Sequence, residues 1–173
     1  MWVSQILSGS CDGEIRVWHV TKFRPLHVIS QAHKGFVRGL SVAGNGRSFV
    51  SCSDDCTIKL WKMPSEEDGN FNYGSSDGGA VLMGTPKDAG EIGKSSSLLI
   101  STTVAKHALT GIDHHWKLPL FATGGAVVEV WDEHRSEPIH SFDWGSATAN
   151  SVKFNPVETD LLASAAADKN IVL

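Results

Sequence analysis

The sequence predicts an all-β fold made of repeated four-stranded units, and three observations support this prediction. One pattern of residues recurs along the chain at a fixed spacing. Within each copy, apolar and polar residues alternate, as they do in half-buried strands. No window of the 173 residues shows the period of an amphipathic helix.

The repeat is clearest in Ser8–Trp18 and Ser51–Trp61, which lie 43 positions apart. A serine, a turn aspartate, an isoleucine, a basic residue and a tryptophan recur in register. A third copy, 121–132, ends in Trp131-Asp132 but has no aspartate six positions before the tryptophan. A fourth copy, 162–173, begins the same pattern and places the next aromatic at position 174. A period of about 40–45 residues with four short strands is typical of a propeller blade.

The strands follow from the local pattern. Ile58 and Leu60 alternate with Lys59, and the same alternation occurs at the end of the first copy. Segments 36–40 and 151–154 have the features of innermost strands that end in tight turns. We therefore expect a partial β-propeller of about three and a half four-stranded blades.

The spacing between the second and third tryptophans is 70 residues, 27 more than the repeat. Residues 64–97 are rich in Gly, Ser, Asp and Glu, which predicts a disordered surface insertion. The expected organisation is blades over 1–62 with the first incomplete, an insertion over 63–100, and blades over 101–173 with the last truncated. An arc of this kind would be open, with exposed strand edges, and in isolation it would tend to associate.

Composition narrows the function. A hydrophobic share of 41% and a charged share of 20% are typical of a soluble globular protein. A net charge of -4 without a clustered basic face argues against binding of naked nucleic acid. No apolar run reaches the roughly 20 residues that span a bilayer, and the N-terminus has no signal or transit pattern. Three cysteines at irregular spacing suit reduced thiols.

The copies resemble WD repeats. In those blades a buried tetrad joins a loop histidine, a serine or threonine, the turn aspartate and the strand tryptophan, and a closed network satisfies each polar member. The resemblance implies a tetrad of His33, Ser51, Asp55 and Trp61 in the second copy. It also implies partial tetrads from Ser8, Asp12 and Trp18 in the first copy and from Ser164 and Asp168 in the fourth.

Four less generic segments, 31–39, 110–117, 130–133 and 151–156, resemble the WD and SOF domain-containing proteins of the nucleolus. That family implies a non-catalytic scaffold of the small-subunit processome, located in the nucleus and nucleolus and acting in pre-rRNA processing and ribosome biogenesis. Its partners would be proteins of a nucleolar ribonucleoprotein particle, with pre-rRNA contacted indirectly.

The alternative implied by the same family is a substrate receptor of a cullin–RING ubiquitin ligase, with a cullin adaptor as partner. The docking pattern Trp-Asp-any-Arg is imperfect in this chain. His134 stands where the pattern has arginine, and Arg135 comes one place late.

The sequence contains few candidates for catalytic or metal-binding residues, and each has a simpler structural explanation. The adjacent histidines 114 and 115 would point to opposite faces of a strand, which favours a structural role over metal binding. Asp54 and Asp55 are better explained as turn residues than as an acid–base pair. A zinc site from Cys52, Cys56 and His33 would lack closely spaced ligand pairs. We expect no enzyme, metal, cofactor or small-molecule substrate.

An interaction role is the remaining class. Loops on a rigid scaffold commonly carry binding, and exposed aromatic residues and arginines are its usual anchors. The residues expected to contact partners are Arg38, Trp116, Trp131, Asp132 and Trp144.

Overall fold

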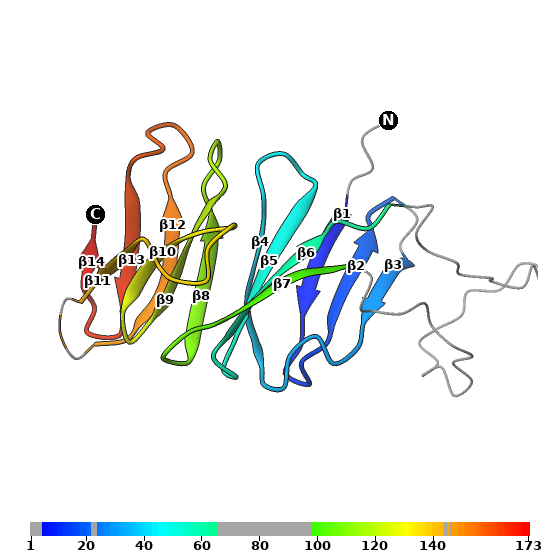
Figure 1. The fold of residues 1–173 in the computed structure, drawn as a ribbon, viewed down its shortest axis with the longest axis horizontal. Coiled ribbons are helices and arrows are strands. Elements are labelled where there is room, and N and C mark those ends of the chain that lie inside the picture. Colours follow the sequence, from blue (N-terminus) through cyan, green and yellow to red (C-terminus); the bar gives the residue numbers. More distant parts are fainter. Residues whose placement is uncertain (1–4, 22–23, 66–97, 144, 146) are drawn as a thin grey trace, which may run out of the picture.

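The computed structural model describes residues 5–21, 24–65, 98–143, 145 and 147–173. These residues form fourteen β-strands arranged in four antiparallel sheets that stand side by side (Figure 1). No helix in the described part of the chain has the length and apolar character needed to cross a membrane. The four antiparallel sheets confirm the predicted all-β, partial propeller fold.

Each sheet is one blade, and its strands pair in chain order. Blade 1 contains β1 (Gln5–Gly9), β2 (Ile15–His19) and β3 (Arg24–Ile29). Blade 2 contains β4 (Val37–Val42), β5 (Ser48–Ser53), β6 (Thr57–Lys62) and β7 (Leu99–Val104). Blade 3 contains β8 (Leu109–His114), β9 (Leu120–Gly125), β10 (Val128–Asp132) and β11 (His140–Phe142). Blade 4 contains β12 (Ala149–Phe154), β13 (Leu162–Ala166) and β14 (Ile171–Val172).

The three repeated tryptophans occupy equivalent strands. Trp18 lies on β2, Trp61 on β6 and Trp131 on β10, and each of these strands pairs with the preceding strand on one side and the outermost strand on the other. Trp61 lies opposite Phe49, with ring centroids 6.1 Å apart. Trp131 lies opposite Phe121 in the same way, with centroids 6.3 Å apart. The sequence repeat is thus a structural repeat.

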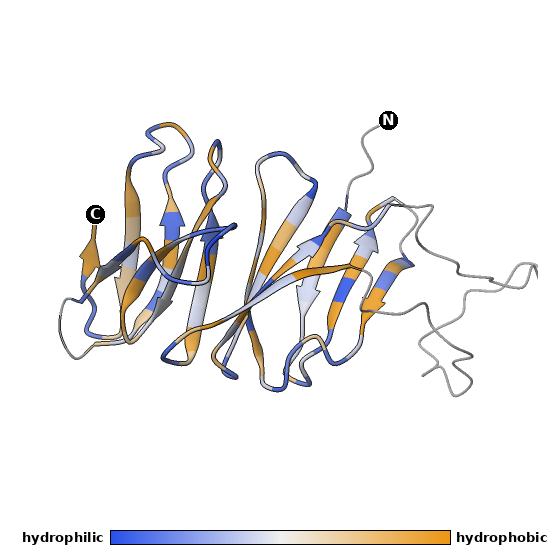
Figure 2. Ribbon diagram, in the orientation of Figure 1, coloured by the Kyte–Doolittle hydropathy of each residue, from blue (hydrophilic) through white to orange (hydrophobic). Residues whose placement is uncertain are grey.

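The hydrophobic core is divided among the contacts between neighbouring blades, and the strands alternate between hydrophobic and hydrophilic residues (Figure 2). The core between blades 1 and 2 consists of Ile15, Ile29, Ala32, Phe49, Trp61 and Leu98. The core between blades 2 and 3 includes Val50, Cys52, Ile58, Leu109, Ile112, Phe121 and Trp131. The core between blades 3 and 4 includes Ala122, Val128, Ala149, Val152 and Phe154. Burial of one large apolar side chain contributes about 1.5–3 kcal/mol, so these contacts hold the arc together.

Blade 2 also shows where the predicted insertion ends. Residues 66–97, the main part of the expected insertion, lie outside the described residues. β7 begins at Leu99, within the last two residues of the expected insertion 63–100. Leu98 is buried against the core that contains Trp61, and this apolar contact returns the chain to the sheet where the Ser-rich stretch ends.

Candidate functional site

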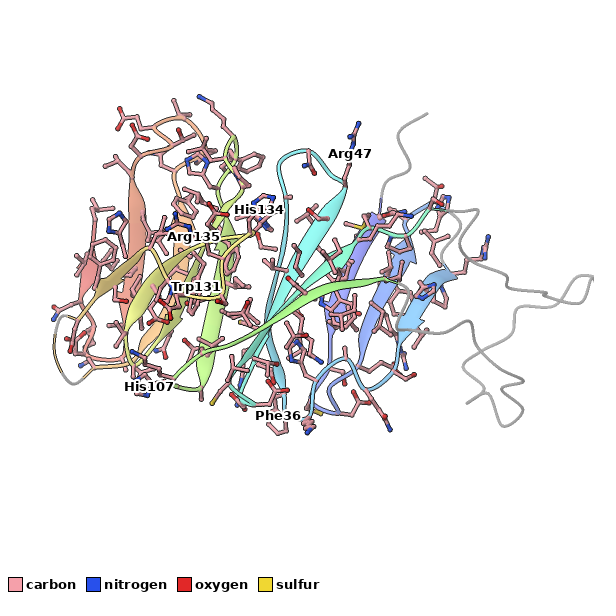
Figure 3. All side chains as sticks on the ribbon, in the orientation of Figure 1. Phe36, Arg47, His107, Trp131, His134 and Arg135 are labelled. Carbon is pink, nitrogen blue, oxygen red and sulfur yellow. The ribbon has the colours of Figure 1, made fainter. Side chains whose placement is uncertain are left out.

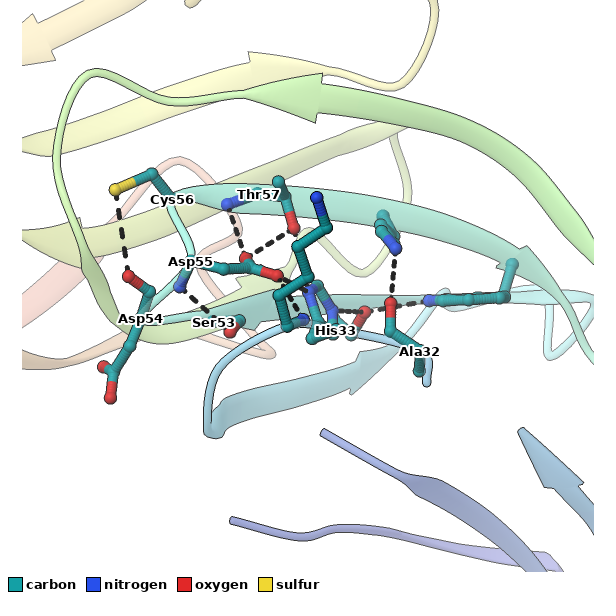
Figure 4. A network of polar contacts seen from close by, with 11 residues as sticks. Ala32, His33, Ser53, Asp54, Asp55, Cys56 and Thr57 are labelled. Atoms are coloured by element: carbon teal, nitrogen blue, oxygen red, sulfur yellow. Dashed lines mark hydrogen bonds and ion pairs between the residues drawn. The ribbon is translucent and has the colours of Figure 1, made fainter. Parts of the chain in front are cut away.

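The polar network of blade 2 joins three elements, and Figure 4 shows it from close by. His33 comes from the loop between β3 and β4, Ser51 from β5 and Trp61 from β6. The Trp61 indole N–H donates to the Ser51 hydroxyl at 2.8 Å. The Ser51 hydroxyl lies 2.6 Å from His33 Nε2, and it donates to this nitrogen when the imidazole is neutral. Ser51 is fully buried, so each partner satisfies a group that water cannot reach.

Asp55 completes the network from the turn between β5 and β6. Its carboxylate oxygens lie 3.2 and 3.3 Å from His33 Nδ1. It also accepts the Lys34 N–H at 2.8 Å, the Thr57 N–H at 2.9 Å and the Thr57 hydroxyl at 2.6 Å. The structure therefore brings together the four residues that the resemblance assigned to the second copy. It adds Thr57, which sequence reasoning did not select.

Two pKa shifts describe the same network. Burial lowers the pKa of His33 below its usual value, although the neighbouring Asp55 opposes this shift. Burial alone would raise the pKa of Asp55, but the hydrogen bonds from Thr57 and Lys34 outweigh it and lower the pKa to about 2. A neutral imidazole and an ionised carboxylate match the donor and acceptor pattern of the network. The arrangement stabilises the blade, because each buried polar group has a partner.

Blade 3 keeps the tryptophan contact by another route. Trp131 donates its indole N–H to Thr123 at 2.9 Å, and Thr123 is fully buried on β9. Thr123 precedes the tryptophan by eight positions, whereas Ser51 precedes Trp61 by ten. The hairpin from β9 to β10 has only residues 126 and 127 between its strands, so it lacks the aspartate turn. Because the shorter hairpin shifts the hydroxyl by two positions, the ungapped repeat pattern does not predict Thr123.

Blades 1 and 4 contain parts of the same arrangement. Trp18 donates to the Ser8 hydroxyl at 2.8 Å. Asp12 is exposed and accepts the Glu14 N–H at 3.0 Å, so it shapes the turn and does not touch Trp18. Ser164 is buried on β13, and Asp168 accepts the Asn170 N–H at 3.0 Å in the following turn.

Asp113 connects three blades at the inner ends of the sheets. It lies on β8 and accepts the Phe154 N–H of β12 at 2.9 Å and the Lys153 ammonium at 2.7 Å. The Ser41 hydroxyl of β4 donates to it at 3.3 Å. Because one carboxylate bonds to both neighbouring blades, it fixes their relative position. No periodic pattern in the sequence predicts the role of this residue.

The adjacent histidines also have structural positions. His114 Nε2 lies 2.8 Å from Glu133 Oε1, and His114 Nδ1 lies 3.2 Å from the Ser41 carbonyl oxygen. His115 Nδ1 accepts the N–H groups of Lys117 and Leu118 at 3.1 and 2.9 Å. The two imidazoles face different partners, so they do not form a shared site.

The loop after His115 presents an exposed aromatic side chain on a fixed support. Trp116 is 57% exposed and Leu118 is 51% exposed. The buried His115 ring accepts two backbone N–H groups of this loop and packs edge-on against Phe154, with ring centroids 5.2 Å apart. A Cβ atom at Gly44 would lie 2.1 Å from the Trp116 carbonyl oxygen, so the neighbouring loop is in close contact as well. Trp116 is therefore available to a partner and is already positioned.

Arg38 lies at the opposite end of the blades from that loop. Its guanidinium bonds to both oxygens of Asp54 at 2.7 Å and lies 4.9 Å from the centre of the Phe36 ring. The hydrogen bond to Asp54 raises the pKa of Arg38, and the same bond lowers the pKa of Asp54. Arg38 is exposed, and a partner that uses it would meet a preformed group of three side chains.

The segment that follows β10 differs from the prediction. Trp131 is only 2% exposed, because it stacks on Phe121 in the core; its assignment as a partner contact is therefore wrong. Figure 3 shows Trp131 within the sheet, with His134 and Arg135 on the loop beyond it. Asp132 accepts the His134 N–H at 2.8 Å and lies 3.1 Å from His134 Nδ1. The hydrogen bonds from His134 lower the pKa of Asp132.

Two further predicted positions are Trp144 and Cys52. Trp144 lies outside the described residues. Cys52 is buried, and this burial raises the pKa of its thiol to about 12, which suits an inert core residue. Within the described residues, no three histidine, cysteine or carboxylate side chains are grouped to hold a metal ion.

Strands, tryptophan contacts and the blade 2 network together define the class. The chain folds as a series of WD-type propeller blades. The family model for the WD domain, G-beta repeat, matches residues 23–62, which cover β3 to β6. This match supports the WD-repeat assignment of the second copy.

Curated relatives extend the similarity to almost the whole chain. The chain is 44% identical over 171 residues to the mouse protein DDB1- and CUL4-associated factor 13. It is 43% identical to the human protein of that name and 38% identical to the one from Dictyostelium discoideum. In each case the similarity covers 99% of this chain and 33% of the relative. The chain thus spans about a third of the length of these relatives.

Proposed function

We propose that this chain is part of a non-catalytic WD-repeat protein that associates with a DDB1–CUL4 assembly and presents other proteins to a cullin–RING ubiquitin ligase. The observation that carries the proposal is the similarity of nearly the whole chain to proteins named for association with DDB1 and CUL4. The fold supports it, because the described blades form a rigid framework with side chains exposed on their loops.

The loop after β10 is the proposed contact with the ligase adaptor. Asp132 ends β10 and Glu133 begins this loop, and the Arg135 N–H donates to the Asp132 carbonyl oxygen at 3.0 Å to form a tight turn. The His134 N–H donates to the Asp132 carboxylate at 2.8 Å, and the arginine of this segment is Arg135, one position later than in the docking pattern. Arg135 is exposed and projects from a loop that is fixed by its own hydrogen bonds.

Co-purification tests this contact. When the chain is produced together with tagged DDB1, the chain should co-purify with DDB1. The charge reversal Arg135→Glu should reduce the amount of co-purified chain at least tenfold. Arg47→Glu is the matched control, since Arg47 is also exposed on a loop at the same end of the blades (Figure 3). Equal loss with both variants, or no retention by the unmodified chain, would contradict the proposed contact. Replacing Trp131 would be uninformative, because its loss would disturb the core.

The proposed contact for presented proteins is the Trp116 loop. An exposed tryptophan on a positioned loop is the kind of residue that dominates binding energy at protein interfaces. Trp116→Ala should weaken binding of partner proteins without changing stability, and Val157→Ala, at an even more exposed apolar position, should leave binding unchanged. Quantitative comparison of the proteins captured by the two variants measures the difference. Identical sets would remove Trp116 from the proposal.

A second candidate function is a scaffold of the small-subunit processome in the nucleolus. It rests on the four segments that resemble the WD and SOF domain-containing proteins, among them Gln31–Gly39 and Ser151–Pro156. Here the blades would hold proteins of a ribonucleoprotein particle in fixed relation, with pre-rRNA bound through those proteins. A tagged full-length protein should then sediment with large nucleolar particles. Diffuse cytoplasmic staining without pre-rRNA in the same fractions would eliminate this candidate.

A further inference from the structure

The outer edge of β7 differs from the other outer edges in the described structure. β7 is the last strand of its sheet, and no described strand pairs with its outer side. Figure 1 shows it crossing in front of the other strands of blade 2. Its sequence, Leu-Ile-Ser-Thr-Thr-Val, contains no charged residue, proline or glycine, and Figure 2 shows no strongly hydrophilic residue along it.

The other outer strands have features that discourage pairing with a further strand. β3 contains Arg24 and Pro25, and β11 has only three residues. Charge, proline and short length are the usual means by which proteins protect a sheet edge. β7 has six residues and none of these means. An unprotected edge of this length offers backbone hydrogen bonds to another strand.

The register of β7 shows which backbone groups are free for this purpose. The Ala105 N–H donates to the Cys56 carbonyl oxygen at 2.8 Å, and Val104 and Thr102 lie opposite Thr57 and Lys59. Hydrogen-bonded and non-hydrogen-bonded pairs alternate in an antiparallel ladder. Since Ala105 bonds to β6, the N–H and C=O groups of Val104 and Thr102 face outward.

The side chains on the same strand are suited to self-pairing. Val104 is 72% exposed and Ile100, at the bulge in the ladder, is 57% exposed. If two β7 strands met antiparallel with Thr102 on the two-fold axis, Ile100 would lie opposite Val104 of the second copy on both sides. β-branched and Thr–Thr pairs across strands are favourable, and no like charges would meet.

We propose that β7 is a self-association surface, through which two copies of this chain pair edge to edge about a two-fold axis at Thr102. A two-fold contact uses the same patch on both copies, which is the commonest symmetry of homo-oligomers. A six-residue edge buries less than the ~1,200 Å² of a stable interface. The association is therefore weak and dependent on concentration.

Sedimentation of the 173-residue chain tests the proposal. The average mass should rise with concentration toward that of a dimer, and Val104→Lys should weaken the dimer at least about tenfold, because it places a charge in both strand pairs. Val157→Lys is the matched control, since Val157 is 82% exposed on the loop between β12 and β13. A monomer at all concentrations, or equal association by the two variants, would overturn the proposal.

Disulfide formation tests the register independently of affinity. In a background with the exposed Cys11 replaced by serine, Thr102→Cys should cross-link under mild oxidation, because the two Cα atoms would be about 5.5 Å apart. Ser101→Cys alone should not cross-link, but it should do so when mixed with Thr103→Cys. Efficient cross-linking of Ser101→Cys alone, or none by Thr102→Cys, would contradict the two-fold at Thr102.

Discussion

Trp131 donates its indole N–H to the Thr123 hydroxyl at 2.9 Å, and this bond is the counterpart of the one from Trp61 to Ser51. The two blades reach it through hairpins of different length. Blade 3 has no turn aspartate, but it has the buried hydroxyl. The contact between tryptophan and hydroxyl occurs in blades 1, 2 and 3, whereas a turn aspartate bonded to a loop histidine is described in blade 2.

The first prediction concerns Ser51. Ser51→Ala removes the partner of both Trp61 Nε1 and His33 Nε2 in a fully buried position. Leaving buried polar groups unpaired costs about 1–3 kcal/mol each, so the free energy of unfolding should fall by about 2–4 kcal/mol. Urea unfolding followed by tryptophan fluorescence measures it. Ser136→Ala, at an exposed position, should change it by less than about 0.5 kcal/mol.

The second prediction concerns Thr123. Thr123→Val keeps the shape of the side chain and removes only the hydroxyl that Trp131 uses. One buried donor loses its partner, so unfolding should become easier by about 1–2 kcal/mol, less than for Ser51→Ala. A double-mutant cycle with Trp131→Phe should give a coupling energy of about 1 kcal/mol. Additive effects of the two substitutions would mean that the bond does not form.

The third prediction concerns acid stability. In the folded chain the pKa of Asp55 is lowered from 3.8 to about 2, because its hydrogen bonds outweigh the effect of burial. A lowered pKa stabilises the folded state above the unfolded value and is lost as the pH falls toward the folded value. Asp55 should therefore contribute about 1–2 kcal/mol at pH 5 that disappears between about pH 4 and pH 2.

The variant Asp55→Asn isolates this contribution. It should be less stable than the unmodified chain at pH 5, and the difference should shrink as the pH falls to 3. His33 changes the same curve at higher pH, since its pKa is also lowered by burial and its contribution is lost below about pH 6.5. A constant difference between the two proteins from pH 5 to pH 3 would show that Asp55 has an ordinary pKa.

How far the sequence predicts this structure depends on which contacts are periodic. Trp18 and Trp61, and Ser8 and Ser51, recur at 43 positions, so the blade type is predicted by the periodic pattern. The network around His33 is implied by the resemblance to WD repeats and not by the spacing. Thr123 is not predicted by the pattern, because the shorter hairpin shifts it by two positions. The docking pattern Trp-Asp-any-Arg predicts that Trp131 is exposed to a partner. The structure buries it, as the repeat pattern of Trp18 and Trp61 would indicate.

The polar contacts between neighbouring blades cannot be predicted from the sequence. Asp113 bonds to Ser41 and Phe154, which are 72 and 41 positions away. A single residue with distant partners leaves no periodic trace, and only the packing of the sheets brings these groups together. The edge character of β7 has the same origin, because a strand is known to be outermost only when the order of the sheet is known.

The fourth prediction follows from Asp113. Asp113→Asn keeps an acceptor for Ser41 but removes the charge that Lys153 and the Phe154 N–H use. Hydrogen bonds to a charged group contribute about 1.5–3 kcal/mol, so a loss of about 2 kcal/mol in unfolding free energy is expected. Lys153→Gln should cost less, because the Lys153 side chain is 66% exposed. Equal losses would mean that the ion pair, and not the link to the backbone of β12, holds the blades.

The central claim is that the tryptophans of the repeat occupy equivalent strands, β2, β6 and β10, with Trp61 and Trp131 bonded to buried hydroxyl groups. Hydrogen exchange of the indole N–H groups, followed by NMR in a ¹⁵N-labelled chain, tests it directly. The account predicts slow exchange for Trp61 and Trp131, with opening free energies close to that of global unfolding, and fast exchange for Trp116. Exchange of Trp131 as fast as that of Trp116 would contradict it.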